Sequence, residues 1–239
     1  NIYYTILRNI YNDKPIVDLD DSNMKSIRSQ LIDSDISVVS LSTNLGYVDI
    51  NDIDSICDDE IIRVFNVAKF FKVESIKVYC GIGGYDAVII NRWMDRITDF
   101  SIQYNLVPIL EIDDKSSLVN PDDAVTVLNK YRRWKLLYDP AQFLVNRKCD
   151  PISKYWRRLS KYVYAIDLRD FKTSRGPKPI GYGDTMILDT FKSALKNNGN
   201  CWCFFEPSLG RRFSGSRTKS ESFNQALEIF KNQIDGITL

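Results

Sequence analysis

Short apolar runs alternate with amphipathic, helix-like segments along almost the whole chain. Seven of the apolar runs predict β-strands. The predicted strands are Tyr3–Leu7, Ile36–Leu41, Ser75–Cys80, Val107–Ile112, Lys135–Tyr138, Val163–Leu168 and Cys201–Phe205. They are continuous rather than alternating in polarity, which is typical of strands that a parallel sheet buries on both faces.

The segments between the strands carry helix start signals. Asn120–Asp123 offers an N-cap, a proline at the first helical position and two acids at the positive end of the helix dipole. Asp58–Glu60 precedes an apolar helical face, and Thr218 with Glu221 has capping-box spacing. Strand–helix alternation predicts an α/β fold with a parallel sheet. No linker divides the chain, so we expect residues 1–239 to form one domain.

A (β/α)8 barrel and an open sheet both fit this pattern. Seven strands are one fewer than the barrel needs, and a βα unit before Asn1 would supply the eighth. No G-x-G-x-x-G fingerprint follows the first strand, which counts against a dinucleotide-binding sheet. Gly81–Gly84 lacks the Lys-Ser/Thr of a P-loop, so it predicts a tight turn rather than a phosphate cradle.

Four of the predicted strands run directly into an acid: Glu111, Asp139, Asp167 and Glu206. Successive acids are 28, 28 and 39 residues apart, about one βα unit each. The carboxyl ends of barrel strands converge on one face, so we expect the four side chains to meet there. Four carboxylates so close need compensation, and a divalent cation supplies it. The alternative is that each acid caps a neighbouring helix or pairs with a local arginine.

The chain contains no histidine, which makes Ser-His, Cys-His and most zinc chemistry improbable. Acid–base work would fall to Asp, Glu, Lys, Tyr or Cys. The sequence has 32 Lys+Arg against 31 Asp+Glu, so net charge gives no argument for a nucleic-acid or membrane partner. The basic and aromatic segments Tyr131–Lys135 and Trp156–Arg158 are interpreted as helix-end charges.

The remaining compositional signals point to the cytoplasm. The five cysteines form no C-x-x-C pair and are odd in number, which predicts reduced thiols. No apolar run is long enough for a membrane helix, and no secretory signal opens the chain. Whether the chain forms a homo-oligomer stays open.

The order of several segments resembles the xylose-isomerase-like TIM barrels, the sugar phosphate isomerase/epimerase group that also includes endonuclease IV. The similar segments are Ala68–Gly81, Leu110-Glu111, Tyr138–Gln142 (compare D-P-x-H), Ala165–Asp170 (compare H-x-K-D), Ile180–Asp184 (compare G-x-G-[DE]) and Phe205–Pro207. The resemblance implies a (β/α)8 TIM barrel in which Tyr3–Arg8 is the second strand. The first βα unit would then lie before Asn1.

The same resemblance implies a divalent-metal-dependent isomerase or epimerase that acts on a sugar or sugar phosphate through an enediolate. Four residues would be metal ligands: Glu111, Asp139, Asp167 and Glu206. Glu111 and Glu206 would also relay the proton. The residues expected to orient substrate are Gln142, Arg169, Asp170 and Arg175, with Arg211 and Arg212 in the loop after the last strand as a phosphate site.

This chain departs from the family where the family has histidines. Asp167 replaces a ligand histidine, and Gln142 replaces the histidine of D-P-x-H. A four-carboxylate site favours Mn²⁺ or Mg²⁺ over Zn²⁺ and calls for neutralisation by Arg169, Arg175 or a nearby lysine. The alternative is a degenerate barrel that binds a sugar-like ligand or a partner. Endonuclease activity is disfavoured, because those relatives use many histidine ligands.

Overall fold

All seven predicted strands are present. A computed structural model describes residues 3–7, 14–147, 155–173, 176–198, 201–206 and 219–235. The strands are β1 (Tyr4–Leu7), β2 (Ser37–Ser42), β3 (Ser75–Val78), β4 (Val107–Glu111), β5 (Lys135–Tyr138), β6 (Val163–Leu168) and β9 (Trp202–Phe205). They form one sheet in the order β1-β2-β3-β4-β5-β6-β9. The β1–β2, β2–β3, β3–β4, β5–β6 and β6–β9 pairs are parallel, as predicted.

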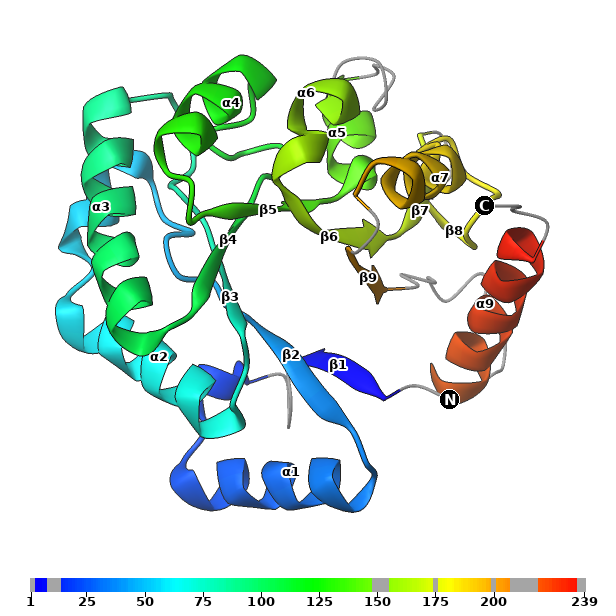
Figure 1. Cartoon of the computed structure of the whole chain (residues 1–239), viewed down its shortest axis with the longest axis horizontal. Helices are drawn as coiled ribbons and strands as arrows, with labels where there is room; N and C mark the ends of the chain where they lie inside the picture. Colours follow the sequence, from blue (N-terminus) through cyan, green and yellow to red (C-terminus); the bar gives the residue numbers. More distant parts are fainter. Residues whose placement is uncertain are drawn as a thin grey trace. The chain divides into compact units, whose positions relative to one another are not determined.

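Helices connect the strands (Figure 1). They are α1 (Asp21–Asp33), α2 (Asp58–Phe71), α3 (Ala87–Tyr104), α4 (Pro121–Lys130), α5 (Pro140–Arg147), α6 (Arg157–Leu159), α7 (Ile187–Asn198) and α9 (Lys219–Ile234). The predicted starts of α2 and α4 are confirmed, because the helices begin at Asp58 and Pro121. Helix α9 begins at Lys219, directly after the predicted cap Thr218, which lies outside the described residues. No helix among the described residues is long and apolar enough to cross a membrane.

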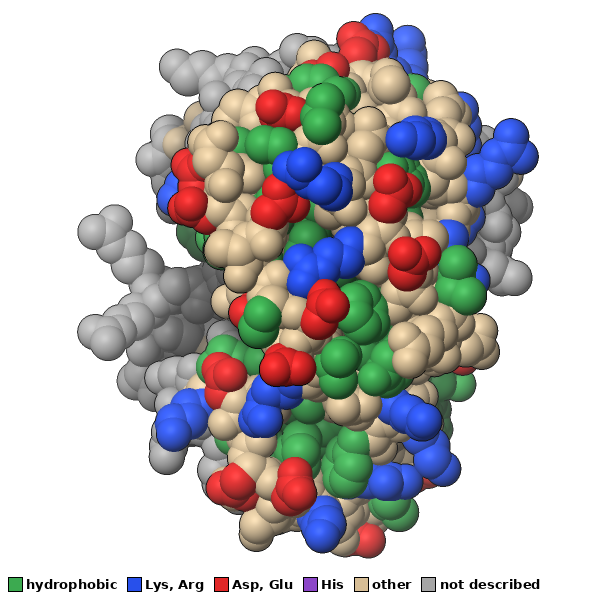
Figure 2. All heavy atoms as spheres, turned by 90° about the vertical axis from the view of Figure 1, so that its left-hand side faces the viewer, with side chains coloured by type: hydrophobic (Ala, Val, Ile, Leu, Met, Phe, Trp, Pro, Cys, Tyr) green, Lys and Arg blue, Asp and Glu red, His purple; other side chains and the backbone are tan. Residues whose placement is uncertain are grey.

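The chain divides into two compact units. The first comprises residues 1–111, 115–118 and 127–135, and it contains β1–β4 and α1–α3. In this unit α2 packs against β2 and α3 against β4. The predicted apolar face of α2 is buried, with Ile61, Phe65 and Ala68 at 0% exposure. The surface of the helices carries acidic and basic side chains interspersed with hydrophobic ones (Figure 2).

The basic segment before β5 stabilises a helix end, as predicted. Arg133 donates hydrogen bonds from its guanidinium to the carbonyl oxygens of Ser101 and Leu106, at 3.0 and 3.1 Å. Ser101 lies in the last turn of α3, near the negative end of the helix dipole, and Leu106 lies directly before β4, so Arg133 joins the end of α3 to the connection that follows it. The adjacent Trp134 is buried and donates to the Thr98 hydroxyl at 3.0 Å.

The Gly81–Gly84 segment, for which the sequence predicts a tight turn, bends at Gly83 and Gly84 between β3 and α3. Gly81 has φ +81°, a conformation that favours glycine, and a Cβ there would lie 2.6 Å from Ile50 Cδ1. Ile82 forms isolated bridges to Asp49 and to Ser116. The Gly81–Gly84 segment therefore contacts two other segments of the first unit, one at Asp49 and one at Ser116.

The second unit comprises residues 112–114, 119–126 and 136–239. Its parallel strands are continued by a short antiparallel hairpin, β7 (Asp170–Lys172) with β8 (Gly176–Lys178), which the sequence did not predict. Aromatic side chains fill part of its core. Tyr138 packs edge-on against Trp156, and Phe143 stacks on Tyr155 with ring centroids 4.1 Å apart.

Candidate active site

Glu111 is a buried carboxylate at the C-terminal end of β4, and it forms an ion pair with Lys77 of β3. The two residues are only 6% and 4% exposed. The register pairs Lys77 with Ile109, so Glu111 lies two residues further along the neighbouring strand and on the same sheet face. A carboxylate this buried needs a counter-charge, and the lysine provides it.

Lys77 is held in place by Tyr79. The Nζ of Lys77 lies 3.1 Å from the Tyr79 hydroxyl and 4.9 Å from the centroid of its ring. The rings of Tyr79 and Tyr47 pack together with centroids 4.6 Å apart. The backbone carbonyl of Tyr79 accepts a hydrogen bond from the Trp93 indole N–H at 2.8 Å. Tyr79, which contacts Lys77, is therefore held in place by its own contacts with Tyr47 and Trp93.

The close approach of another backbone segment also fixes Tyr79. Gly46 has φ +80°, and a Cβ there would lie 2.1 Å from the Tyr79 carbonyl oxygen. No side chain fits this gap, so glycine is required by both conformation and space. Tyr79 also donates its backbone N–H to the Leu45 carbonyl at 2.8 Å.

Asp139 is fully buried and makes two contacts inside the second unit. One oxygen accepts the backbone N–H of Ala141 at 2.9 Å, at the start of α5. The other oxygen is paired with the guanidinium of Arg169, whose side chain is 20% exposed. Helix capping and arginine pairing were the alternative uses foreseen for these acids, and Asp139 shows both. Neutralisation by Arg169, also predicted, is confirmed for this carboxylate.

The strand register brings Asp167 beside Asp139. Tyr138 pairs with Ile166, so the next residue of each segment is an acid at the carboxyl end of its strand. Asp167 pairs with Phe204 of β9, and Glu206 follows two residues later. Asp167 is 5% exposed and Glu206 is half-buried. Three of the four predicted acids thus follow or end adjacent strands of one unit.

Asp170 organises a loop. Its carboxylate accepts hydrogen bonds from the backbone N–H groups of Phe171, Gly181, Gly183 and Thr185 and from the Thr185 hydroxyl, the shortest at 2.7 Å. A Cβ on Gly183 would lie 2.1 Å from one carboxylate oxygen. These contacts explain why Asp170 is buried, and its predicted contact with substrate stays a prediction.

The remaining predicted substrate residues divide between described and undescribed parts of the chain. Gln142 is half-buried on α5, two residues after Pro140. Arg175, Arg211 and Arg212 lie outside the described residues.

Lys77 was missed by the sequence analysis, although it left a signal. It is a charged residue in the middle of the apolar run Ser75–Cys80, where a charge needs a buried partner. Burial raises the pKa of the neighbouring Cys80 thiol, which is 2% exposed. Burial therefore keeps Cys80 as the neutral thiol, which is a poor nucleophile, so Cys80 is not a candidate catalytic residue.

The described residues do not present the donor set of a divalent metal site. Lys77 binds the Glu111 carboxylate, and the two oxygens of Asp139 are engaged by the Ala141 N–H and by Arg169. Within the ranges that the structure describes, no three Cys, Asp or Glu side chains gather closely enough to hold an ion. The compensating charges seen at these two carboxylates are side-chain cations.

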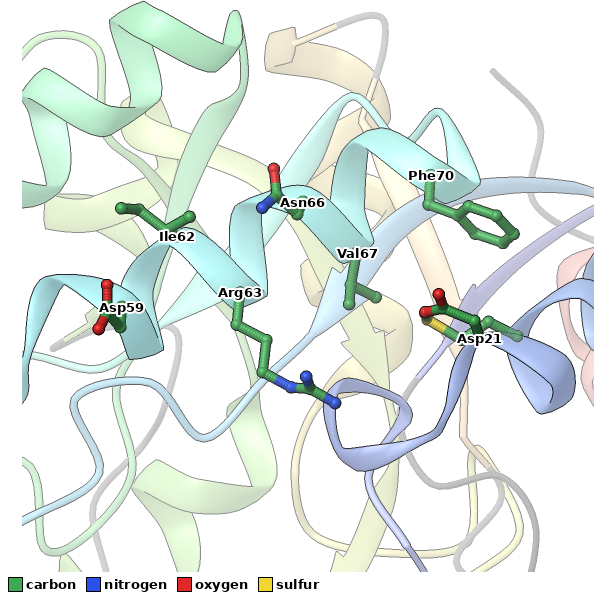
Figure 3. A pocket seen from close by; sticks show the side chains of 8 residues that line it. Asp21, Asp59, Ile62, Arg63, Asn66, Val67 and Phe70 are labelled. Atoms are coloured by element: carbon green, nitrogen blue, oxygen red, sulfur yellow. The ribbon is translucent and has the colours of Figure 1, made fainter.

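A separate hollow of about 420 Å³ lies on the outer surface of the first unit (Figure 3). It lies along α2, and Asp21, Met24, Asp59 and Arg63 are among the side chains that line it. Arg63 donates to the carbonyl oxygens of Val17 and Leu19, at 2.6 and 3.3 Å, so its charge anchors the segment before α1. The residues that line the hollow all belong to α1 and α2.

Solved structures of known proteins match this chain over almost its whole length, although no protein-family model and no curated protein sequence does. A xylose isomerase domain protein from Planctomyces limnophilus has a TM-score of 0.73 at 12% identity, covering 98% of this chain and 89% of its own. A D-tagatose 3-epimerase-like protein gives the same four values.

A third structure, the IolI protein with a bound zinc atom, has a TM-score of 0.71 at 17% identity over 98% of this chain and 87% of its own. At these identities the likeness concerns the fold. The predicted fold class is confirmed: the chain has the fold of the xylose-isomerase-like TIM barrels, with seven of the eight barrel strands in its described residues.

Proposed function

We propose that the chain is an isomerase or epimerase that moves a proton on a sugar or sugar phosphate by means of its carboxylates. The observation that carries the proposal is Glu111, a buried carboxylate with its own counter-charge at the carboxyl end of β4. In TIM barrels this end of the strands is where catalytic residues lie. Proteins that share the fold include one named as D-tagatose 3-epimerase-like.

In the proposed reaction Glu111 removes the proton from the carbon next to the substrate carbonyl. The electron pair of the broken C–H bond forms a C=C bond, and the carbonyl oxygen becomes the enediolate oxygen. In an epimerisation Glu206 returns a proton to the opposite face of the same carbon, the C=C electron pair forms the new C–H bond, and the carbonyl re-forms. In an isomerisation the proton goes to the neighbouring carbon instead, and the hydroxyl proton of the first carbon passes to the enediolate oxygen, so that the carbonyl forms on the first carbon. Gln142 and Arg169 would bind substrate hydroxyls, and Asp139 and Asp167 would shape the negative side of the site.

The predicted phosphate contacts belong to the same proposal. Arg175, Arg211 and Arg212 would bind a phosphate, because guanidinium groups match its geometry. Asp170 would act by holding the loop in which Gly181 and Gly183 lie. A phosphorylated sugar is therefore the favoured substrate.

The sequence also predicts a divalent metal, with Mn²⁺ or Mg²⁺ favoured over Zn²⁺. The contacts of the described residues give less support to this metal than to the other parts of the prediction. Among proteins of this fold, one holds a zinc atom and another is in complex with magnesium, but here Glu111 and Asp139 are paired with side-chain cations. We therefore write the proposed reaction without a metal.

Solvent isotope exchange tests the proposal. The protein is incubated in D₂O with a panel of ketoses, aldoses and their phosphates, and deuterium at the carbon next to the carbonyl is measured by NMR. Glu111→Gln and Glu206→Gln should each lower exchange about 10²–10⁴-fold, which is the usual contribution of a positioned acid or base. The matched control is Glu228→Gln, an exposed glutamate on α9 that is paired with Lys231. Exchange at the wild-type rate in both active-site variants would rule out the assigned roles.

The second candidate is a barrel that binds a sugar-like ligand without turning it over. The observation that favours it is Asp139, whose two oxygens are taken up by helix capping and by Arg169. A sugar that raises the melting temperature of the wild-type protein while no deuterium is exchanged would favour this candidate.

A further inference from the structure

The structure assigns to Lys77 the charge that a divalent metal would otherwise supply at Glu111: we propose that this part of the site works without a metal. The inference rests on the proposed role of Glu111 as the proton acceptor. It concerns only the first unit, in which Lys77, Tyr79 and Glu111 all lie.

The first step of the argument is charge. The side chains of Lys77 and Glu111 are 5% and 7% exposed, so neither charge is hydrated enough to stand alone. The ammonium is in direct contact with the Glu111 carboxylate. A cation that came to the same carboxylate would meet an ammonium in a weakly screened interior, where repulsion between like charges is strong.

The second step is that Lys77 cannot swing away easily. Tyr79 holds the ammonium through its hydroxyl and its ring face. Tyr79 is itself clamped by the Trp93 indole and by the close backbone of Gly46. The pairing register of β3 and β4 fixes the positions of the Cα atoms of Lys77 and Glu111. Displacing the lysine would therefore cost several contacts at once.

The third step is what the ammonium can do. It carries three N–H groups, and among the described residues Tyr79 and Glu111 account for two. The third can donate to a substrate oxygen beside the carboxylate. When Glu111 takes the proton from carbon, the electron pair moves to the C–C bond and negative charge develops on the carbonyl oxygen. A fixed ammonium stabilises that charge as it forms.

This assignment narrows the substrate class. The ligand has a carbonyl with a C–H bond next to it, as an open-chain ketose or aldose has. Its carbonyl oxygen would lie on Lys77 and the carbon-bound proton on Glu111. Lys77 stays an ammonium throughout, so no covalent bond to the protein and no redox partner is needed.

The test begins with metal alone and the full chain. The melting temperature of the wild-type protein is measured after EDTA treatment and then in millimolar MnCl₂. We expect no change, because a metal that binds only the folded state would raise it. A rise in Mn²⁺ that Glu111→Gln abolishes would overturn the inference, since it would place a metal on this carboxylate.

A double-mutant cycle tests the ion pair itself. Lys77→Met should lower the melting temperature by about 6–20 °C, because it leaves a buried carboxylate without a counter-charge. Adding Glu111→Gln should restore at least half of that loss, since the charge is then gone. Lys69→Met, an exposed lysine of α2, is the control and should have little effect. Additive losses in the double variant would overturn the pairing. If Lys77→Met does not fold, the wild-type metal titration still decides.

The deuterium exchange assay separates failure of this inference from failure of the proposed function. Exchange that survives EDTA supports both. Exchange that EDTA removes and Mn²⁺ restores overturns the inference while the proposed function stands. If the wild-type protein exchanges no deuterium before EDTA, the proposed function fails, and the metal titration alone decides the inference.

Discussion

Asp170→Ala gives the sharpest test of how the second unit is held together. Asp170 is 6% exposed and accepts five hydrogen bonds, two of them from Thr185, which is fully buried. A hydrogen bond to a charged group contributes about 1.5–3 kcal/mol. The N–H of the exposed Gly181 can bind water instead, whereas Thr185 is fully buried, and its hydroxyl has among the described residues only the more distant Arg169 carbonyl, at 3.4 Å, as another acceptor. Counting only the two bonds from Thr185 gives a loss of about 3–6 kcal/mol.

For a chain of this size each kcal/mol corresponds to about 2–4 °C, so the melting temperature should fall by roughly 6–24 °C. Differential scanning calorimetry measures it. The matched control is Asp184→Ala in the same loop, because Asp184 is exposed and, within the described ranges, its carboxylate accepts one hydrogen bond, from the Thr173 N–H at 3.3 Å. Equal shifts in the two variants would refute the reasoning, because they would show that the buried contacts of Asp170 add nothing.

Two further predictions concern the support of Lys77 and the thiols. Gly46→Ala should lower the melting temperature by several degrees, because its Cβ would collide with the Tyr79 carbonyl at a positive φ, whereas Gly84→Ala, with no atom within 4 Å of its Cβ, should not. In native protein, Ellman's reagent should modify the exposed Cys57 rapidly and leave Cys80 unmodified until unfolding, since burial raises the pKa of Cys80 and keeps it neutral. Peptide mapping reads each site, and labelling of both at one rate would contradict the second prediction.

The positions of the strands could be predicted because buried parallel strands are continuous apolar runs bounded by polar residues. All seven lie where the pattern put them, within about two residues at each end, the usual scatter of element boundaries. The helix starts were also readable, since Pro121 and the acids around it are local signals. Local chemistry decides these features, so one sequence is enough to find them.

The β7–β8 hairpin could not be predicted from pattern. Each strand has three residues, too few for alternation to be visible, and β8 consists of Gly176, Pro177 and Lys178. What holds the adjoining loop is the Asp170 carboxylate, which reaches residues 11 to 15 positions away. A side chain that replaces backbone pairing leaves no periodic signal in the sequence.

The cation that pairs with each buried acid is hard to predict from sequence for a related reason. Asp139 precedes a proline, so the sequence indicates helix capping, and Arg169 lies close enough in the pattern of strand ends to be predicted as a neutralising cation. Lys77 is 34 residues from Glu111, and only the register of β3 on β4 brings them together. For Glu111 the sequence shows that the negative charge has to be balanced but not that Lys77 balances it.

An ammonium and a metal ion balance charge differently, and the difference has a consequence for substrate recognition. A divalent ion can hold two adjacent substrate oxygens at once, so it both charges and orients a sugar. The Lys77 ammonium is a point charge, and among the described residues two of its three N–H groups are accounted for. With the third it can hold one substrate oxygen, which leaves the sugar free to turn about that contact. Groups that bind the far end of the substrate must then orient it. Arginines bind a phosphate especially strongly, so a protein that uses Lys77 in place of a metal should show a larger ratio of exchange rates between a phosphorylated sugar and the free sugar than a metal-dependent relative does. Equal exchange rates with a sugar and its phosphate would contradict this chain of reasoning at its last step.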